Sequence, residues 1–127
     1  WRLKTNMDSG MFDALQRTGA FILNSPWGFV GEMCDIYRRR RDLLAEALVS
    51  VGMEVPKPKA TVYMWVPVPA GYTSASFSEH VLEQAGVVVT PGRGYGPAGE
   101  GFVRLSLTTP DDRIAEAVQR IERSLKL

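Results

Sequence analysis

The residues best suited to chemistry lie in the stretch VVVTPGRGYGPAGEGFVRLSL, residues 87–107. Its Gly94, Gly96 and Gly99 match the G-x-G-x-x-G pattern that binds the pyrophosphate of a dinucleotide. That chemistry needs a helix N-terminus directed at the phosphates. After Gly99 the chain instead passes directly into a second strand pattern. We therefore expect a long flexible hairpin connection, whose glycines permit backbone geometry that side chains would forbid.

Arg104 stands inside the otherwise apolar strand pattern that follows this loop. If the strand alternates, Arg104 lies on the face opposite to Val103 and Leu105, which take the core. Its side chain could extend over the solvent face. Alternatively, its planar guanidinium could enter a cleft beside the loop and hold a carboxylate through two charge-assisted hydrogen bonds, of about 1.5–3 kcal/mol each. Spacing alone leaves both interpretations open.

The charge balance argues against a nucleic-acid partner. Fifteen Lys and Arg face fourteen Asp and Glu, so the net charge is +1 and no global field draws the chain to polyanions. The run Arg38-Arg39-Arg40-Arg41 spreads around its predicted helix, because successive residues point about 100° apart. Tyr63 and Trp65 alternate on one strand face, where packing explains them more simply than base stacking does.

Cysteine and histidine are too scarce for a metal site. One Cys34 and one His80 exclude an internal disulfide and a Cys/His zinc cluster within this chain, so we predict no metal. A reducing cytoplasm is the expected location. No apolar run approaches the ~20 residues that span a bilayer, so we predict no membrane contact.

The elements that must position these residues follow from periodicity and capping. Helices are predicted over 8–23 and 31–51. A short helix is predicted to begin at a capping box of Ser76 and Glu79 and to end at Gly86, and a last helix is predicted after the N-cap Thr109. Strands are predicted over 61–66, 87–90 and 102–108. The order of two helices, strand, helix, two strands and helix predicts an α+β fold, with helices on a small, mostly antiparallel sheet.

Four segments together resemble a known family: LKTNMDSG, YRRRRDLL, TVYMWVPVPAGYTS and VVVTPGRGYGPAGEGFVRLSLTTPDDRIAEAVQRI. They resemble the C-terminal part of a class I/II (fold type I) pyridoxal-phosphate aminotransferase, closest to the LL-diaminopimelate and aspartate-type branch. The resemblance implies a three- to four-stranded small domain over residues 31–127. It also implies that residues 1–30 lead from a large cofactor domain that is missing here. Because the chain opens on Trp1, we expect a trimmed piece or the tail of a longer protein.

The resemblance implies roles for particular residues. Arg104 would bind the α-carboxylate of the substrate, and Asn6 would approach the active site across the interface of a homodimer. Arg2 would match the family arginine that binds the cofactor phosphate. The four lysines, Lys4, Lys57, Lys59 and Lys126, do not stand in the Ser-x-x-Lys context of the Schiff-base lysine. We therefore expect no catalytic residue in this fragment, and pyridoxal 5'-phosphate only in the full-length enzyme.

The expected function is transfer of an amino group between an amino acid and a 2-oxo acid by the complete enzyme. This chain alone is expected to be inactive. The alternative is a non-catalytic α+β module that binds a small carboxylate metabolite through Arg104 and the glycine loop. A nucleic-acid module built on the arginine run is disfavoured by the near-zero net charge.

Overall fold

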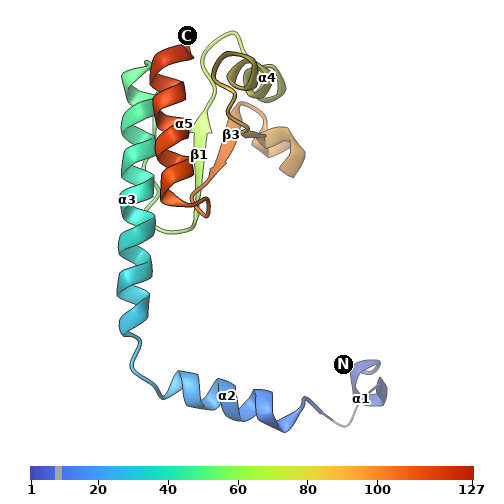
Figure 1. Cartoon of the computed structure of the whole chain (residues 1–127). Helices are drawn as coiled ribbons and strands as arrows, with labels where there is room; N and C mark the ends of the chain where they lie inside the picture. Colours follow the sequence, from blue (N-terminus) through green and yellow to red (C-terminus); the bar gives the residue numbers. More distant parts are fainter. Residues whose placement is uncertain (8–9) are drawn as a thin grey trace. The chain divides into compact units, whose positions relative to one another are not determined.

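The structure is a computed structural model that describes residues 1–7 and 10–127. These residues form two compact units, Trp1–Glu32 and Met33–Leu127. The elements, labelled in Figure 1, are α1 Lys4–Met7, α2 Asp13–Leu23, α3 Gly28–Ser50, β1 Tyr63–Pro67, α4 Ser74–Ala85, β2 Thr90–Pro91, the 3-10 turns η1 Gly92–Tyr95 and η2 Pro97–Gly99, β3 Phe102–Ser106 and α5 Asp111–Ser124. Across these two described ranges, no helix is both long and apolar enough to cross a membrane.

The sheet of the second unit has three strands in the order β1-β3-β2, and both pairings are antiparallel. Strand β3 is therefore central. Arg104 on β3 lies opposite Trp65 of β1 and Thr90 of β2. Directly opposed residues in an antiparallel sheet project to the same face. The register thus gathers these three side chains on one face.

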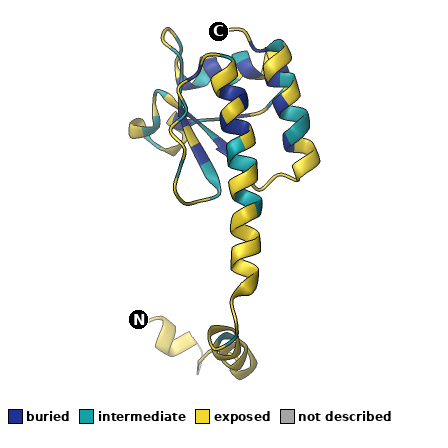
Figure 2. Cartoon of the chain, turned by 90° about the vertical axis from the view of Figure 1, so that its left-hand side faces the viewer, coloured by how far each residue is buried: buried dark blue, intermediate teal, exposed yellow. Residues whose placement is uncertain are grey.

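The core lies on the other face of the sheet. Helices α3 and α5 lie side by side against the sheet in Figure 1, and Figure 2 shows their dark blue, buried residues turned inward. One buried cluster joins residues of the three helices and the sheet: Leu44, Ala45, Ala47, Leu48, Met64, Val66, Phe77, Val81, Ala85, Val103, Leu105, Leu107, Ile114, Val118 and Ile121. The predicted α+β class, with helices on a small antiparallel sheet, is confirmed.

Helices α4 and α5 are capped by residues other than those predicted. Thr73, not Ser76, is the N-cap of α4: its hydroxyl accepts from the Ser76 N–H at 3.1 Å, and the Ser76 hydroxyl accepts from the Thr73 N–H at 3.0 Å. The capping box thus uses serine at its fourth position, and the prediction of Ser76 with Glu79 was wrong by three residues. Helix α5 begins at Asp111 after Pro110, because Pro110 has an extended backbone (ψ 153°). The predicted stop of α4 at Gly86 is confirmed by its left-handed φ of 63°.

The strands are shorter than predicted. Thr61 has a positive φ of 78°, so β1 cannot include it and starts at Tyr63. In place of the strand predicted over 87–90, β2 consists of Thr90 and Pro91, which pair with β3. Residues 87–89 are not part of a strand. Helix α3 extends three residues before its predicted start at Gly31.

The first unit has no buried residue among those described, 1–7 and 10–32. Helix α2 begins at Asp13, and the predicted cap at Asp8-Ser9 lies outside the described residues. An isolated helix of 11 residues is marginal in water, because helical stability in proteins comes chiefly from packing an apolar face. Helix α2 therefore lacks, among the described residues, the buried face that ordinarily stabilises a helix.

Candidate functional site

Arg104 occupies the middle of the central strand. Its neighbours Val103 and Leu105 are buried in the core, whereas Arg104 and Ser106 are half-buried on the opposite face. The predicted alternation is confirmed, and it extends to Leu107, which is also buried. The strand itself therefore directs the Arg104 side chain away from the helices and toward the face that carries Trp65.

Tyr63 and Tyr95 both contact the Arg104 guanidinium, and we call these two residues the tyrosine clamp. The guanidinium carbon lies 4.2 Å from the centre of the Tyr63 ring and 4.7 Å from the centre of the Tyr95 ring. Tyr95 also meets Trp65 edge to face, with ring centres 5.4 Å apart. Both guanidinium distances are well within the range of cation–π attraction. The guanidinium is therefore in contact with one aromatic ring from β1 and one from the glycine loop.

The same guanidinium has one buried donor without an acceptor among the described residues. Its Nε atom is buried and has no hydrogen-bond partner there, and none of the ion pairs found among the described side chains includes Arg104. A buried N–H without an acceptor is uncommon, because the loss of its hydration is left uncompensated. The Nε–H of Arg104 is therefore a donor that no described residue satisfies.

The glycine loop that carries Tyr95 is ordered by short turns. Two 3-10 turns, η1 and η2, fill the connection that we predicted to be a long flexible hairpin, and no α-helix begins within it. Gly92 and Gly99 approach so closely that a Cβ built on either would lie 2.1 Å from the backbone oxygen of the other. Close backbone approach therefore explains these two glycines.

Glu100 joins the end of the loop to the start of α4. Its carboxylate accepts hydrogen bonds from the backbone N–H of Ser74 at 2.7 Å, from the Ser74 hydroxyl at 3.0 Å and from the N–H of Gly101 at 3.1 Å. These bonds hold the pKa of Glu100 below its ordinary value, and the bond from the Ser74 backbone N–H has the largest effect. Glu100 is therefore a carboxylate at neutral pH.

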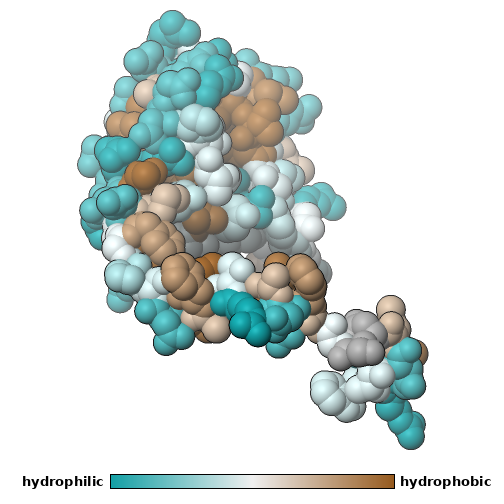
Figure 3. Space-filling model, turned by 60° about the horizontal axis from the view of Figure 1, so that its bottom comes forward, coloured by the Kyte–Doolittle hydropathy of each residue, from teal (hydrophilic) through white to brown (hydrophobic). Residues whose placement is uncertain are grey.

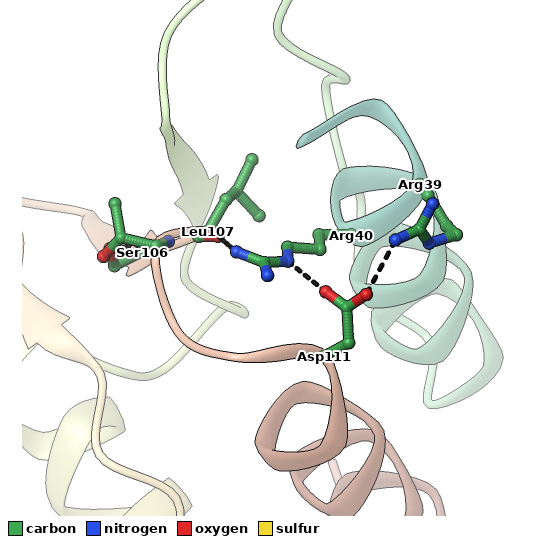
Figure 4. A network of polar contacts seen from close by, with 6 residues as sticks. Arg39, Arg40, Ser106, Leu107 and Asp111 are labelled. Atoms are coloured by element: carbon green, nitrogen blue, oxygen red, sulfur yellow. Dashed lines mark hydrogen bonds and ion pairs between the residues drawn. The ribbon is translucent and has the colours of Figure 1, made fainter. Parts of the chain in front are cut away.

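The arginine run takes part in structural contacts. Arg40 donates to the backbone oxygen of Leu107 at 2.9 Å and pairs with Asp111, to which Arg39 also donates at 2.7 Å (Figure 4). The bonds from Arg39 and Arg40 lower the pKa of Asp111. Arg41 donates to the Pro58 oxygen at 3.1 Å. The contacts of Arg39 and Arg40 join α3 to the end of β3 and the start of α5. The side chains of the arginine run therefore serve different contacts and do not form one basic stripe.

Replacing Arg40 by methionine is expected to lower the free energy of unfolding by about 1–3 kcal/mol, because the carbonyl of the buried Leu107 loses its donor. The Arg40 side chain is only 16% exposed. Arg39 is 61% exposed, so Arg39→Met should cost less than about 1 kcal/mol. Urea unfolding followed by circular dichroism compares the two variants. Equal losses would contradict the assignment.

The other candidate residues make contacts of their own. Arg2 and Asn6 are both exposed in the first unit, where the Asn6 amide donates to the Arg2 backbone oxygen at 2.7 Å. Lys57 pairs with Asp42 at 3.3 Å. Two hollows of about 310 and 300 Å³ lie elsewhere in the second unit and are not lined by Arg104.

Sequence reasoning did not identify Tyr95, Ser74 or Glu100 as parts of the site. Tyr95 is the only aromatic residue between Val87 and Gly101, and Glu100 is the only acidic one. A single aromatic and a single acidic residue in a glycine-rich loop could have marked both positions as candidates. The sequence pattern does not indicate which distant residue each side chain contacts.

The second unit is thus an α+β domain whose central strand presents Arg104 on the face opposite to the core, with its Nε unpartnered among the described residues. Comparisons with known proteins identify the family of the chain. The profile of the family described as "Aminotransferase class I and II" matches residues 3–121. This chain belongs to that family, as the resemblance predicted.

Among curated relatives, the LL-diaminopimelate aminotransferase of Dehalococcoides mccartyi (strain BAV1) is 52% identical over 120 residues, which are 94% of this chain and 31% of the relative. The Aquifex aeolicus enzyme of that name is 46% identical over 126 residues, 99% of this chain and 32% of the relative. The chain therefore spans about a third of the length of these relatives.

Solved structures agree in fold. The L,L-diaminopimelate aminotransferase from Chlamydomonas reinhardtii superposes with a TM-score of 0.78 at 34% identity, over 95% of this chain and 30% of that one. A probable N-succinyldiaminopimelate aminotransferase from Thermus thermophilus gives a TM-score of 0.80 at 36% identity, over 98% of this chain and 33% of that one.

Proposed function

We propose that residues 31–127 are the substrate-side domain of a pyridoxal-phosphate-dependent aminotransferase, in which Arg104 binds the α-carboxylate of the amino-acid or 2-oxo-acid substrate. The observation that carries this proposal is the guanidinium of Arg104, which contacts two aromatic rings and whose buried Nε has no hydrogen-bond partner among the described residues. The names of the relatives favour LL-diaminopimelate as the amino acid. In this proposal, residues 1–30 lead from a large cofactor domain.

The geometry suits orientation of a substrate. A guanidinium offers parallel N–H donors that match the two oxygens of a carboxylate. Because Tyr63 and Tyr95 both contact the group, part of its side-chain freedom is already lost before a ligand binds. A carboxylate fixed in this way would bring the amino or oxo carbon to a reproducible position, which is a main contribution of enzymes to rate.

Pyridoxal 5'-phosphate supplies the electron sink of transamination when it is bound. The described residues do not make up a complete site for it: no lysine of the sequence stands in the Ser-x-x-Lys context of the family, Lys57 pairs with Asp42, and Lys59 lines one of the hollows. We propose that polypeptide outside these 127 residues would provide the lysine. By resemblance, Arg2 would contact the cofactor phosphate.

The exposed apolar residues of the first unit support a further part of the proposal. Figure 3 shows brown, hydrophobic side chains over α2, and the large apolar residues of this unit with exposed side chains are Trp1, Leu3, Met7, Met11, Phe12, Leu15, Phe21, Ile22, Leu23, Trp27, Phe29 and Val30. Exposed apolar surface of this extent typically marks an interface. We propose that it packs against the large domain and the second subunit of a homodimer, with Asn6 near the active site of that subunit.

A chimera tests the proposed function. The present chain would replace the matching third of the Dehalococcoides mccartyi enzyme, to which it is 52% identical. We expect transamination of LL-diaminopimelate with a 2-oxo acid, and we expect Arg104→Ala to reduce kcat/KM by about 100-fold or more, since two charge-assisted bonds are lost. A folded, cofactor-loaded chimera that is inactive, or one unaffected by Arg104→Ala, would refute the proposal.

The isolated chain is expected to show no transaminase activity and no specific binding of pyridoxal phosphate, because a lysine beside the substrate site is required. Incubation with the cofactor should leave its absorbance spectrum that of the free compound. Borohydride reduction followed by peptide mass spectrometry should find no preferred lysine. A stoichiometric adduct on a single lysine would contradict this expectation.

A further inference from the structure

Ser74 links the two ends of the glycine loop to the start of α4. It is completely buried, and it is the first residue of that helix. Its hydroxyl accepts from the backbone N–H of Arg93, at the start of the loop, at 3.4 Å and donates to the Glu100 carboxylate, at the end of the loop. One buried side chain therefore contacts both ends of the segment that carries Tyr95.

The Glu100 carboxylate is the strongest part of this link. It accepts three hydrogen bonds, two of them from Ser74, in the first turn of a 12-residue helix. Negative charge is favoured at a helix N-terminus, where backbone N–H groups lack partners within the helix. A neutral amide in the same place could keep its oxygen on the two backbone N–H groups, but it would lose the negative charge and present an N–H group to the Ser74 hydroxyl, which now donates to the carboxylate.

Tyr95 lies between the two anchored ends, and it is one half of the tyrosine clamp. Tyr63, the other half, is fixed independently because it belongs to β1. Among the described residues, Tyr95 is held by its loop and by its ring contacts with Trp65 and Arg104. If the anchor at Glu100 is lost, the Tyr95 side of the clamp should open while the Tyr63 side remains.

We propose that Glu100 is a positioning residue: through Ser74 and the glycine loop it holds Tyr95 over the Arg104 guanidinium, and so fixes the direction in which Arg104 presents its N–H groups to a carboxylate. The part of this inference that concerns carboxylate binding rests on the proposed function of Arg104. The part that concerns the position of Tyr95 over Arg104 involves only the protein and can be measured without a ligand.

The Nε–H proton of Arg104 reports the state of the clamp. In the present chain this proton is buried and lies near aromatic rings, so its NMR signal should exchange slowly with water and be displaced by ring currents. The signal is assigned by its disappearance in Arg104→Lys. In Glu100→Gln, exchange should become about tenfold faster and the displacement should shrink, because the loop opens locally. Ser74→Ala should act in the same direction.

Glu83→Gln is the matched control, since Glu83 is an exposed residue of the same helix α4. It should leave the Arg104 signal unchanged. Circular dichroism and thermal unfolding establish that each variant is folded. Should Glu100→Gln not fold, Tyr95→Leu together with Ser74→Ala tests the same clamp. An unchanged Nε–H signal in folded Glu100→Gln, or in both substitute variants, would overturn the proposal.

Titration with 2-oxoglutarate separates this inference from the proposed function. We expect Glu100→Gln to weaken binding by about tenfold, because the guanidinium loses its fixed orientation. If the unaltered chain does not bind the ligand but its Nε–H signal still depends on Glu100, the clamp assignment stands and the carboxylate role of Arg104 fails. If binding needs Arg104 but neither the signal nor the affinity depends on Glu100, the positioning role fails.

Discussion

Arg104→Ala is expected to weaken the binding of 2-oxoglutarate to the isolated chain by about 100-fold or more. Two charge-assisted hydrogen bonds would be lost, and at about 1.5 kcal/mol each they amount to roughly two orders of magnitude in affinity. The fold should remain, because Arg104 is half-buried on the face opposite to the core and has no polar partner among the described residues. Isothermal titration or chemical-shift titration measures the change.

Arg104→Lys separates the charge from the shape of the group. A lysine keeps the positive charge but has no planar fork, so it should recover only part of the affinity. Arg123→Ala is the control, because Arg123 is exposed in the last turn of α5. Equal binding by the unaltered chain and Arg104→Ala would show that the carboxylate contacts another part of the surface.

Gly99→Ala is expected to destabilise the second unit by about 3 kcal/mol and to displace Tyr95. A Cβ on Gly99 would lie 2.1 Å from the backbone oxygen of Gly92 and 2.7 Å from its carbonyl carbon. Backbone atoms cannot rotate away as the end of a side chain can, so the two turns must separate, and overpacking of this kind typically costs about 1–3 kcal/mol. Gly92→Ala should behave alike, since its Cβ would also meet the Phe102 oxygen at 2.6 Å.

Gly94→Ala is the matched control in the same loop. A Cβ at Gly94 would meet nothing within 4 Å, and its φ lies outside the left-handed region. We expect a change below about 0.5 kcal/mol. Thermal unfolding compares the three variants, and the Arg104 Nε–H signal reports the position of Tyr95. A loss of stability in Gly94→Ala equal to that in Gly99→Ala would contradict the close-approach explanation.

Local patterns were sufficient for much of the fold. The apolar residues Ile114, Val118 and Ile121 recur at helical spacing, and all three are buried in α5. The alternation from Val103 to Leu107 predicted which face of β3 meets the core. Such patterns succeed because a helix or strand repeats its geometry over a few residues, whatever the remainder of the chain does.

Element ends were predicted less well, because several residues compete for the same local role. Thr73 and Ser76 each stand three residues before a possible capping partner, and the structure uses Thr73. At α5, Thr109 precedes a proline whose extended backbone delays the helix to Asp111. Packing of each helix against the core decides between such alternatives, and packing is not a local property.

The amino-acid sequence by itself determined the α+β class, the orientation of Arg104 relative to the core, and the aminotransferase resemblance, all from short-range periodicity and long ordered motifs. Only the tertiary structure decided which distant residues meet. Arg104 contacts Tyr63, Glu100 meets Ser74 across 26 residues of chain, and Arg40 meets Asp111 across 71. Contacts between residues so far apart depend on the path of the whole backbone, because loop lengths, strand register and core packing together set which side chains come within reach.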